Sequence, residues 1–247
     1  MGDDGATGEG PGQDCTVTVR AGGPYWVQGP VSLVRRRSVM SEHGEPLTWQ
    51  TTVRLPTAGD YALCRCGGSA TKPFCDGTHA SNGFAADDTA PDVPYDEQAR
   101  PYELTGVVMR DDRSLCVHAG FCGNRLTNVW KMARADAAAD SVARAQLMTM
   151  IERCPSGALT YRLATEGDDV EPELPAQAAV IDDGPIFLSG RVPVTLDDGT
   201  RLEVRNRMTL CRCGASESKP LCDGSHKKTE FRDSSITTGQ PESGGAR

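Results

Sequence analysis

The sequence contains few aromatic residues and no long apolar run. Phenylalanine, tryptophan and tyrosine together make up 5% of the 247 residues, so we do not expect one large aromatic-rich core. Nothing approaches the roughly 18 consecutive apolar residues of a membrane span. Residues 1–14 are acidic and glycine-rich, and they lack the basic start and apolar stretch of a signal peptide. We therefore expect a cytoplasmic protein with no membrane partner.

A strongly positive charge is also missing. The net charge of −8 argues against a nucleic-acid partner, because such a partner needs a concentrated basic face. The sequence has no glycine-rich nucleotide loop, no serine–histidine–aspartate arrangement and no helical histidine–glutamate zinc motif. We therefore predict that the protein is not an enzyme.

Glycine, proline and cysteine, by contrast, are plentiful. The 27 glycines and 16 prolines indicate short elements joined by many turns. Small domains with thin cores usually need a disulfide or a metal for stability. Ten cysteines could supply either, and in a reducing cytoplasm clustered cysteines more often bind metals.

Most of the cysteines fall in an internal repeat. Residues 64–67 recur as residues 211–214, and residues 72–79 recur as residues 219–226. A phenylalanine also stands five residues after the last histidine of each copy. We conclude that a whole module is duplicated, and not only a metal-binding loop.

We predict an α+β fold that is rich in strands. Apolar and polar residues alternate within 24–34 and 47–55 of the first copy, and within 186–196 and 201–210 of the second. Residues 38–46 are expected to form an enlarged hairpin loop in the first copy.

The segment between the two copies has a different pattern. Residues 102–109 and 158–163 predict strands, and residues 141–153 place apolar side chains at near-helical spacing, which together indicate a β-α-β segment. The expected divisions are a disordered or strand lead-in at 1–20, a first module at 21–94, a central module at 95–168, a second module at 169–233 and a disordered tail at 234–247.

Each copy carries three cysteines and one histidine at the spacing C-x-C-x8-C-x3-H. Two cysteines that are two residues apart in a tight loop can both point their thiolates at the same side of a metal site. A cysteine and a histidine one helical turn apart lie on the same face of that turn. Three thiolates and one imidazole also suit tetrahedral zinc, so ligand chemistry alone leaves zinc open. The candidate ligands are Cys64, Cys66, Cys75 and His79, called here the first motif, and Cys211, Cys213, Cys222 and His226, called the second motif.

The pattern resembles the CDGSH iron–sulfur domain family. Its fuller signature, C-x-C-x2-S/T-x3-P-x-C-D-G-S/A/T-H, is met at every position in both copies, including Ser69 and Ser216. The resemblance implies one [2Fe–2S] cluster in each motif, with three cysteines and one histidine as ligands in a small β-cap fold. Family members with two motifs can pair them within one chain, so we expect a monomer with two pseudo-symmetrically related modules.

The histidine ligands predict an intermediate reduction potential. All-thiolate [2Fe–2S] clusters of the plant type lie near about −400 mV, and replacing two cysteines by histidines raises the potential to about −150 mV or above. We hypothesise that reduction couples to protonation of His79 or His226, and that acid weakens the iron–nitrogen bond.

The central segment predicts a third site. Cys116 and Cys122 match the outer cysteines of a C-x2-C-x2-C run, Ala119 takes the middle position, and Cys154 precedes a proline as in ferredoxins. The segment is similar to the divergent single-cluster 4Fe–4S ferredoxin-like domain, which implies an inserted ferredoxin-like module. Three cysteines fit a [3Fe–4S] cluster, whereas His118 or an external ligand would complete a [4Fe–4S] cluster. Three buried thiols without a cluster are the alternative.

These sites together predict an electron-transfer protein. It would accept electrons from a reductase and pass them to an oxidoreductase. Storage of a labile cluster and its delivery to an apo-acceptor protein is a second possibility, and redox sensing is a third.

Overall fold

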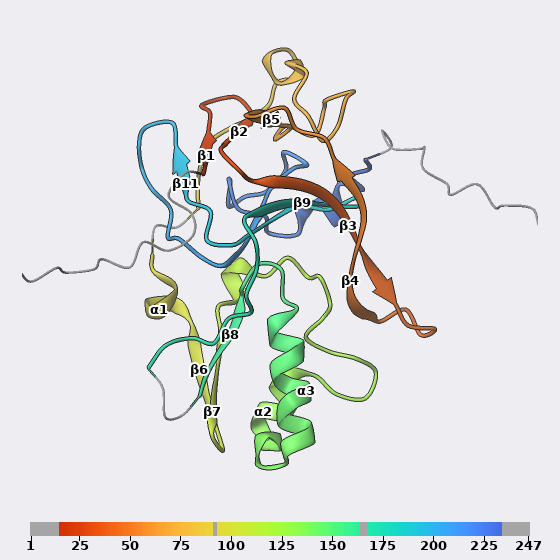
Figure 1. Cartoon of the computed structure of the whole chain (residues 1–247), viewed down its shortest axis with the longest axis vertical. Coiled ribbons are helices and arrows are strands. Elements are labelled where there is room, and N and C mark those ends of the chain that lie inside the picture. The colour runs from red at the N-terminus through yellow and green to blue at the C-terminus, as the bar shows by residue number, and fades with distance from the viewer. Residues whose placement is uncertain (1–14, 91–92, 164–166, 234–247) are drawn as a thin grey trace, which may run out of the picture.

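The computed structural model describes residues 15–90, 93–163 and 167–233, which form two parts (Figure 1). The larger part holds strands from both repeat copies, and the smaller part is the central segment. The predictions for the lead-in before residue 15 and for the tail at 234–247 lie outside the described residues.

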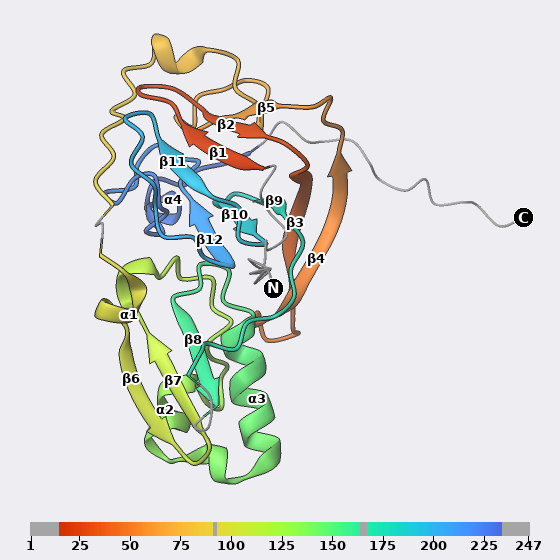
Figure 2. The same cartoon turned by 60° about the vertical axis from the view of Figure 1, so that its left-hand side comes forward.

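A four-stranded sheet is built mainly from the first copy. Its order is β11-β1-β2-β5, with β1 (Thr16–Val19), β2 (Tyr25–Gln28) and β5 (Tyr61–Leu63) from the first copy and β11 (Val194–Leu196) from the second. Strand β1 pairs in parallel with β11 and antiparallel with β2. The second copy therefore contributes the edge strand beside β1, as Figure 2 shows.

A five-stranded sheet is built mainly from the second copy. Its order is β12-β10-β9-β3-β4. Strand β3 pairs in parallel with β9, so the first copy completes the sheet of the second copy. The second copy supplies β9 (Gln177–Ile181), β10 (Ile186–Ser189) and β12 (Arg207–Leu210), and the first copy supplies β3 (Ser32–Met40) and β4 (Pro46–Leu55).

The two sheets share one apolar core. Val17, Leu33 and Leu63 of the first copy belong to the same buried cluster as Ile186 and Leu210 of the second. Full burial of a side chain of this size contributes roughly 1.5–3 kcal/mol. Because each copy supplies part of the cluster, neither copy encloses this core with its own strands alone.

The central segment forms a three-stranded antiparallel sheet covered by helices (Figure 1). Helix α3 begins after Asp140, whose side chain accepts hydrogen bonds from the backbone N–H groups of Val142 and Ala143, as a helix cap should. Its Leu147 and Ile151 are buried against the sheet. The elements are β6 (Arg100–Leu104), β7 (Val107–Asp111), α2 (Val129–Arg134), α3 (Ser141–Glu152) and β8 (Leu159–Leu163).

Short helical turns complete the described chain. Helix α1 (Tyr95–Gln98) leads into the central sheet, and α4 (Ser225–Lys228) contains the histidine of the second motif. The remaining turns are 3-10 segments: η1 (Thr78–Ala80), η2 (Arg113–Leu115) and η3 (Ala137–Ala139).

The strand-rich α+β class is confirmed. The four-stranded and five-stranded sheets, which each contain strands of both copies, are open. The helix predicted at 141–153 and the strand predicted at 158–163 are also found. The single strand predicted at 102–109 is wrong, because a turn at Thr105 and Gly106 divides it into the hairpin of β6 and β7. Gly106 has a φ of +75°, which suits glycine.

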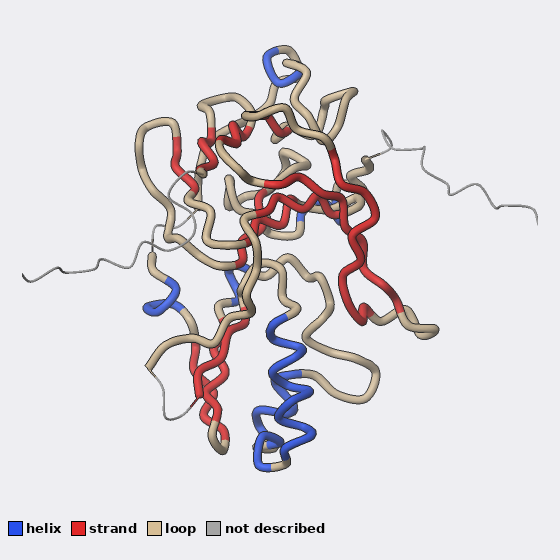
Figure 3. The backbone as a smooth tube through the Cα atoms, viewed as in Figure 1, coloured by secondary structure: helices blue, strands red, loops and turns tan. Residues whose placement is uncertain are grey.

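Four segments of the repeat copies also differ from the prediction. The hairpin loop predicted at 38–46 is present but shorter, since β3 runs to Met40 and β4 starts at Pro46, which produces the long hairpin in Figure 3. The run at 24–34 is interrupted between β2 and β3, and that at 186–196 between β10 and β11. Of residues 201–210, only β12 is a continuous strand.

The helices found within the described ranges are too short or too polar to cross a membrane.

Candidate metal centres

The two motif loops have the same backbone conformation. The N–H of Cys64 donates to the carbonyl of Pro73 at 2.8 Å, and the N–H of Cys211 donates to that of Pro220 at 2.8 Å. These bonds place each C-x-C segment, which follows the last strand of its sheet, beside the loop that carries the third cysteine. The duplicated sequence therefore produces a duplicated loop.

Within each motif, the candidate ligands come as two close pairs. Two thiolates on one tetrahedral metal, each bound at about 2.3 Å, lie about 3.8 Å apart. A thiolate and an imidazole on one metal lie slightly closer, because the metal–nitrogen bond is shorter. The separations are 3.9 Å for Cys64 Sγ and Cys66 Sγ, 3.3 Å for Cys75 Sγ and His79 Nδ1, 3.8 Å for Cys211 Sγ and Cys213 Sγ, and 3.4 Å for Cys222 Sγ and His226 Nδ1.

These distances suit two metal ions in each motif, with two protein ligands on each. Across the described residues, no group of three or more histidine, cysteine, aspartate or glutamate side chains is placed to hold a single metal ion. The donor set and the pair distances therefore fit a binuclear cluster.

An aspartate fixes each loop where its histidine turn begins. One oxygen of Asp76 accepts from the N–H of Thr78 at 3.0 Å, and its other oxygen accepts from the N–H of Ala70 at 2.7 Å. Asp223 makes the equivalent bonds to residues 225 and 217, both at 2.9 Å. The hydrogen bond from the Thr78 hydroxyl, followed by these two N–H bonds, lowers the pKa of Asp76. Burial would raise the pKa of Asp223, but its hydrogen bonds from residues 217 and 225 outweigh burial and lower it. Each aspartate thus joins the start of the histidine turn to the loop that follows the C-x-C segment.

The two motifs meet through their C-x-C segments. Cys66 and Cys213 form an isolated antiparallel bridge. A Cβ atom at Gly67 would lie 2.6 Å from the Cys213 carbonyl oxygen, and one at Gly214 would lie 2.8 Å from the Cys66 carbonyl oxygen. Only glycine permits this approach, so both glycines hold the two sites next to each other.

The second motif is more buried than the first. Cys222 and His226 are 3% and 7% exposed, whereas Cys75 and His79 are half-buried. Tyr25 of the first copy also donates from its hydroxyl to the carbonyl of Cys211 at 2.7 Å. The corresponding residue of the second copy, judged from the repeat, is Ile186, which has no hydroxyl to donate. Water therefore has easier access to the first motif.

Burial also changes the acid–base properties of the second motif. Burial, helped by the positive charges of Lys227 and Arg212, lowers the pKa of His226 to about 4. The imidazole is therefore neutral at neutral pH, which is the form that binds a metal. A hydrogen bond from the Cys213 thiol lowers the pKa of Cys211 despite burial, which favours the thiolate form that binds a metal.

Sequence reasoning missed the arginine between the first two cysteines of each motif. Arg65 lies over the Phe84 ring at 5.5 Å and pairs with Asp88. Arg212 lies over the Phe231 ring at 5.0 Å and pairs with Asp233. Both guanidinium groups are 1% exposed, so each brings a buried positive charge close to thiolates. The signal was present in the repeated C-R-C and the repeated phenylalanine spacing.

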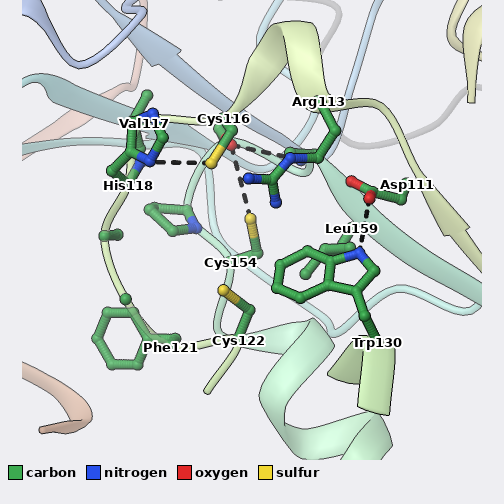
Figure 4. Close-up of a pocket in the computed structure, with 15 residues that line it drawn as sticks. Asp111, Arg113, Cys116, Val117, His118, Phe121, Cys122, Trp130, Cys154 and Leu159 are labelled. Atoms are coloured by element: carbon green, nitrogen blue, oxygen red, sulfur yellow. Dashed lines mark hydrogen bonds between the residues drawn. The ribbon is translucent and has the colours of Figure 1, made fainter. Parts of the chain in front are cut away.

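The third site is a pocket of about 200 Å³ in the central segment. Its lining includes the three predicted cysteines, Cys116, Cys122 and Cys154, whose sulfur atoms face a shared space in Figure 4. Burial and the neighbouring sulfurs of Cys154 and Cys116 together raise the pKa of Cys122 to about 11. This repulsion between thiolates is what a bound metal cluster would relieve.

His118 lies at the edge of this pocket. Its backbone N–H donates to Cys116 Sγ at 3.4 Å. Its ring atom Cδ2 is 3.1 Å from the place where a Cβ of Gly224 would stand, so the ring packs toward the second motif. The cysteine loop of the third site and the histidine turn of the second motif are therefore neighbours.

Three further pocket residues were not predicted. The indole N–H of Trp130 donates to Asp111 Oδ2 at 2.7 Å, and the Arg113 guanidinium lies 4.7 Å from the Trp130 ring (Figure 4). The other oxygen of Asp111 is buried and has no hydrogen-bond partner among the described residues. These residues come from β7, η2 and α2, and no local spacing pattern marks them.

Comparison with known protein families agrees with this geometry. The family described as iron-binding zinc finger CDGSH type matches residues 22–80 and 183–227, and the family described as divergent 4Fe-4S mono-cluster matches residues 102–164. No curated protein and no solved structure matched the chain. The chain is thus an iron–sulfur protein. It carries two CDGSH-type domains that flank a divergent 4Fe–4S mono-cluster domain.

Proposed function

We propose that this protein is a one-electron carrier that holds a [2Fe–2S] cluster in each CDGSH motif and a third cluster in the central segment. The observation that carries the proposal is the arrangement of each motif as a Cys–Cys pair and a Cys–His pair at tetrahedral ligand separations. A [2Fe–2S] cluster takes two protein ligands on each iron, and when bound it supplies reversible one-electron transfer. A mononuclear zinc site would need all four ligands around one point.

For the third site we propose three cysteine ligands, Cys116, Cys122 and Cys154. The ring of His118 packs toward Gly224, which favours a role for this residue outside the ligand set. A [3Fe–4S] cluster, or a [4Fe–4S] cluster with an external fourth ligand, matches three thiolates. The folds that we propose are two β-cap modules related by a pseudo-two-fold axis and an inserted ferredoxin-like segment.

The protein residues bind, orient and shield the clusters in this proposal. Asp76 and Asp223 fix the turns that carry the histidines, and Gly67 and Gly214 bring the two motifs together. Because the motifs already meet within one chain, we propose a monomer in the reducing cytoplasm. Its partners would be a reductase as donor and an oxidoreductase as acceptor, and the chain would not be a catalyst itself.

The exposure of the first motif favours a second candidate function, cluster delivery. Cys75 and His79 are half-buried, and an acceptor thiol can attack only an accessible cluster. Incubation with a cluster-free ferredoxin would distinguish the two functions. Transfer of iron and sulfide from the first motif supports delivery, whereas repeated reduction and oxidation with unchanged iron content supports electron transfer.

Iron and sulfide analysis after anaerobic purification tests the proposal as a whole. We expect about seven or eight iron atoms per chain, of which about four belong to the two CDGSH motifs. We also expect about eight acid-labile sulfides per chain with either type of third cluster, and an electron paramagnetic resonance signal after reduction. A colourless, sulfide-free protein loaded with zinc would show the proposal to be wrong.

A further inference from the structure

The second motif holds the cysteine loop of the third site. Lys227, the residue after the histidine ligand, donates from Nζ to the carbonyl of His118. Gly224 approaches the same loop, because a Cβ placed on it would lie 3.1 Å from His118 Cδ2 and 3.5 Å from the Val117 carbonyl oxygen. The loop between Cys116 and Cys122 therefore rests on the turn that positions His226.

The strand that leads into the second motif holds the other cysteine of the third site. Arg207 in β12 is 1% exposed, and its Nη1 donates to the carbonyl of Cys154 at 2.8 Å. Nη1 also donates to the carbonyl of Ile151 at 2.8 Å, and Nη2 donates to that of Leu159 at 3.0 Å. Glu171 pairs with this guanidinium and balances its charge. One buried side chain thus fixes the backbone on both sides of Cys154.

The first motif has different residues at these positions. Ala80 stands where the second motif has Lys227, and Asp60 stands where β12 has Arg207. The Asp60 carboxylate accepts from Gln28 Nε2 at 3.1 Å, within its own copy. A Cβ on Gly77, which corresponds to Gly224, would meet nothing within 4 Å. The two motif turns therefore differ in these contacts with the third site. The first copy reaches the same loop through the hairpin of β3 and β4, away from its motif, where the rings of Trp49 and Phe121 lie 4.7 Å apart and Pro46 approaches Gly120.

We infer that the second motif and the third site form one coupled unit, in which a cluster bound at either site stabilises the cluster at the other, while the first motif binds its cluster independently of the third site. This inference rests on the proposed function, since it assumes that both sites hold clusters. Lys227 and Arg207 act as positioning residues, because they hold backbone beside the ligands and do not bind metal. Coupling of this kind is reciprocal, so it can be measured from both sites.

The first experiment measures how a cluster in each motif depends on the third site. Full-length Cys75→Ala removes a ligand of the first motif, and Cys222→Ala removes one of the second, so each variant keeps one intact motif. Adding Cys122→Ala then removes the third cluster. Loss of the visible spectrum is followed in excess iron chelator. We expect Cys122→Ala to shorten the half-life of the second-motif cluster by at least about fivefold, the lower end of typical coupling, and that of the first-motif cluster by less than twofold.

The reverse experiment uses a matched pair of glycines in the otherwise unchanged chain. Gly77 and Gly224 have φ values of +89° and +88°, so alanine causes the same backbone strain at both, but only Gly224→Ala pushes on His118. We expect Gly224→Ala to lower the amount and alter the resonance signal of the third cluster, and Gly77→Ala to leave both unchanged. Lys227→Ala changes an exposed side chain and should produce a smaller effect in the same direction.

The outcomes separate this inference from the proposed function. Wild-type protein with seven or eight iron atoms, whose two motifs respond equally to Cys122→Ala, would overturn the coupling alone. Wild-type protein with about four iron atoms would remove the third cluster and the coupling together, but not the CDGSH clusters. If an emptied motif prevents folding, His79→Cys in the intact chain gives the first cluster a distinct all-thiolate spectrum, and the same half-lives are measured.

Discussion

Single glycines and a single tyrosine determine how the two CDGSH motifs meet. Gly67 and Gly214 allow two backbones to touch, and the Tyr25 hydroxyl reaches from the first copy to the Cys211 carbonyl. Each of these contacts joins residues that are far apart in the sequence. They make the environment of each cluster depend on the other copy.

Gly67→Ala should destabilise the protein and loosen both clusters. The added methyl would lie 2.6 Å from the Cys213 carbonyl oxygen, and overpacking of this kind typically costs about 1–3 kcal/mol. Gly44→Ala is the control, since Gly44 has a φ of +77° against +76° for Gly67 but has nothing within 4 Å of its Cβ position. Gly67→Ala should unfold at a lower denaturant concentration and lose iron to a chelator faster than Gly44→Ala. Equal behaviour would mean that the contact between motifs contributes nothing.

Tyr25→Phe should weaken the second cluster more than the first. It removes the hydroxyl donor of the Cys211 carbonyl, and a buried acceptor left unpaired costs about 1–3 kcal/mol, whereas the Pro220 carbonyl keeps its bond from the Cys211 N–H. Tyr61→Phe removes a similar buried bond, to Val31, away from the motif loops. We expect similar losses of unfolding free energy in both variants, but faster loss of the second cluster only in Tyr25→Phe. Identical cluster half-lives would argue against a role for the hydroxyl in that loop.

At the residue scale, sequence spacing identified the side chains that the structure brings together. Cysteine and histidine ligands of one motif lie within a short loop, so their spacing is a local property. The repeated C-R-C marks Arg65 in the sequence, but Tyr25 and Arg207 could not be found from spacing, because their partners lie in the other copy or in the central segment. Long-range partners leave no periodic pattern in a single sequence.

At the scale of elements, local signals predicted local structure. Helix α3 has apolar residues at helical spacing and a capping aspartate, and it was predicted almost to its last residue. The hairpin of β6 and β7 was read as one strand, because its turn contains only Thr105 and Gly106 between two apolar runs. The parallel pairings of β1 with β11 and of β3 with β9 were beyond prediction, since the paired strands are separated by most of the chain.

Asp140→Ala should destabilise the central segment through helix α3. The carboxylate accepts from the N–H groups of Val142 at 3.1 Å and Ala143 at 2.8 Å, and loss of such a cap costs about 0.5–2 kcal/mol. Because the helix ends just before Cys154, the third cluster should be lost at lower denaturant concentration. Asp140→Asn should restore most of the stability, since asparagine is also a good cap. A variant with wild-type denaturation and third-cluster retention would contradict this.

At the scale of the whole molecule, a buried ionic group joins the two copies. Asp233 pairs with Arg35 of β3 and with Arg212 of the second motif. Burial alone would raise the pKa of Asp233. The guanidinium groups of Arg212 and Arg35 outweigh burial and lower this pKa below its usual value of about 3.9. The carboxylate is therefore charged and paired throughout the neutral range.

The pH dependence of unfolding should reveal this group. Since the folded pKa lies below the unfolded one, the stabilisation is complete above about pH 4 and is lost as the pH falls from there through the folded pKa. Cluster-free protein, unfolded by urea at a series of pH values, gives the measurement without interference from cluster loss. Asp233→Asn should remove part of the acid dependence and lower the stability at neutral pH. An unchanged slope below pH 4 would contradict this prediction.

The exchange of strands between the two halves also sets an order for biosynthesis. When the ribosome has made the first CDGSH motif, the strand that flanks β1 and the loop that touches Cys66 do not yet exist, because they are residues 194–196 and Cys213. The first cysteine loop therefore lacks these contacts until residue 213 has emerged from the ribosome. For the proposed first cluster we therefore expect stable insertion of iron and sulfide only after the second motif has been synthesised, even though the ligands of the first motif are synthesised earlier.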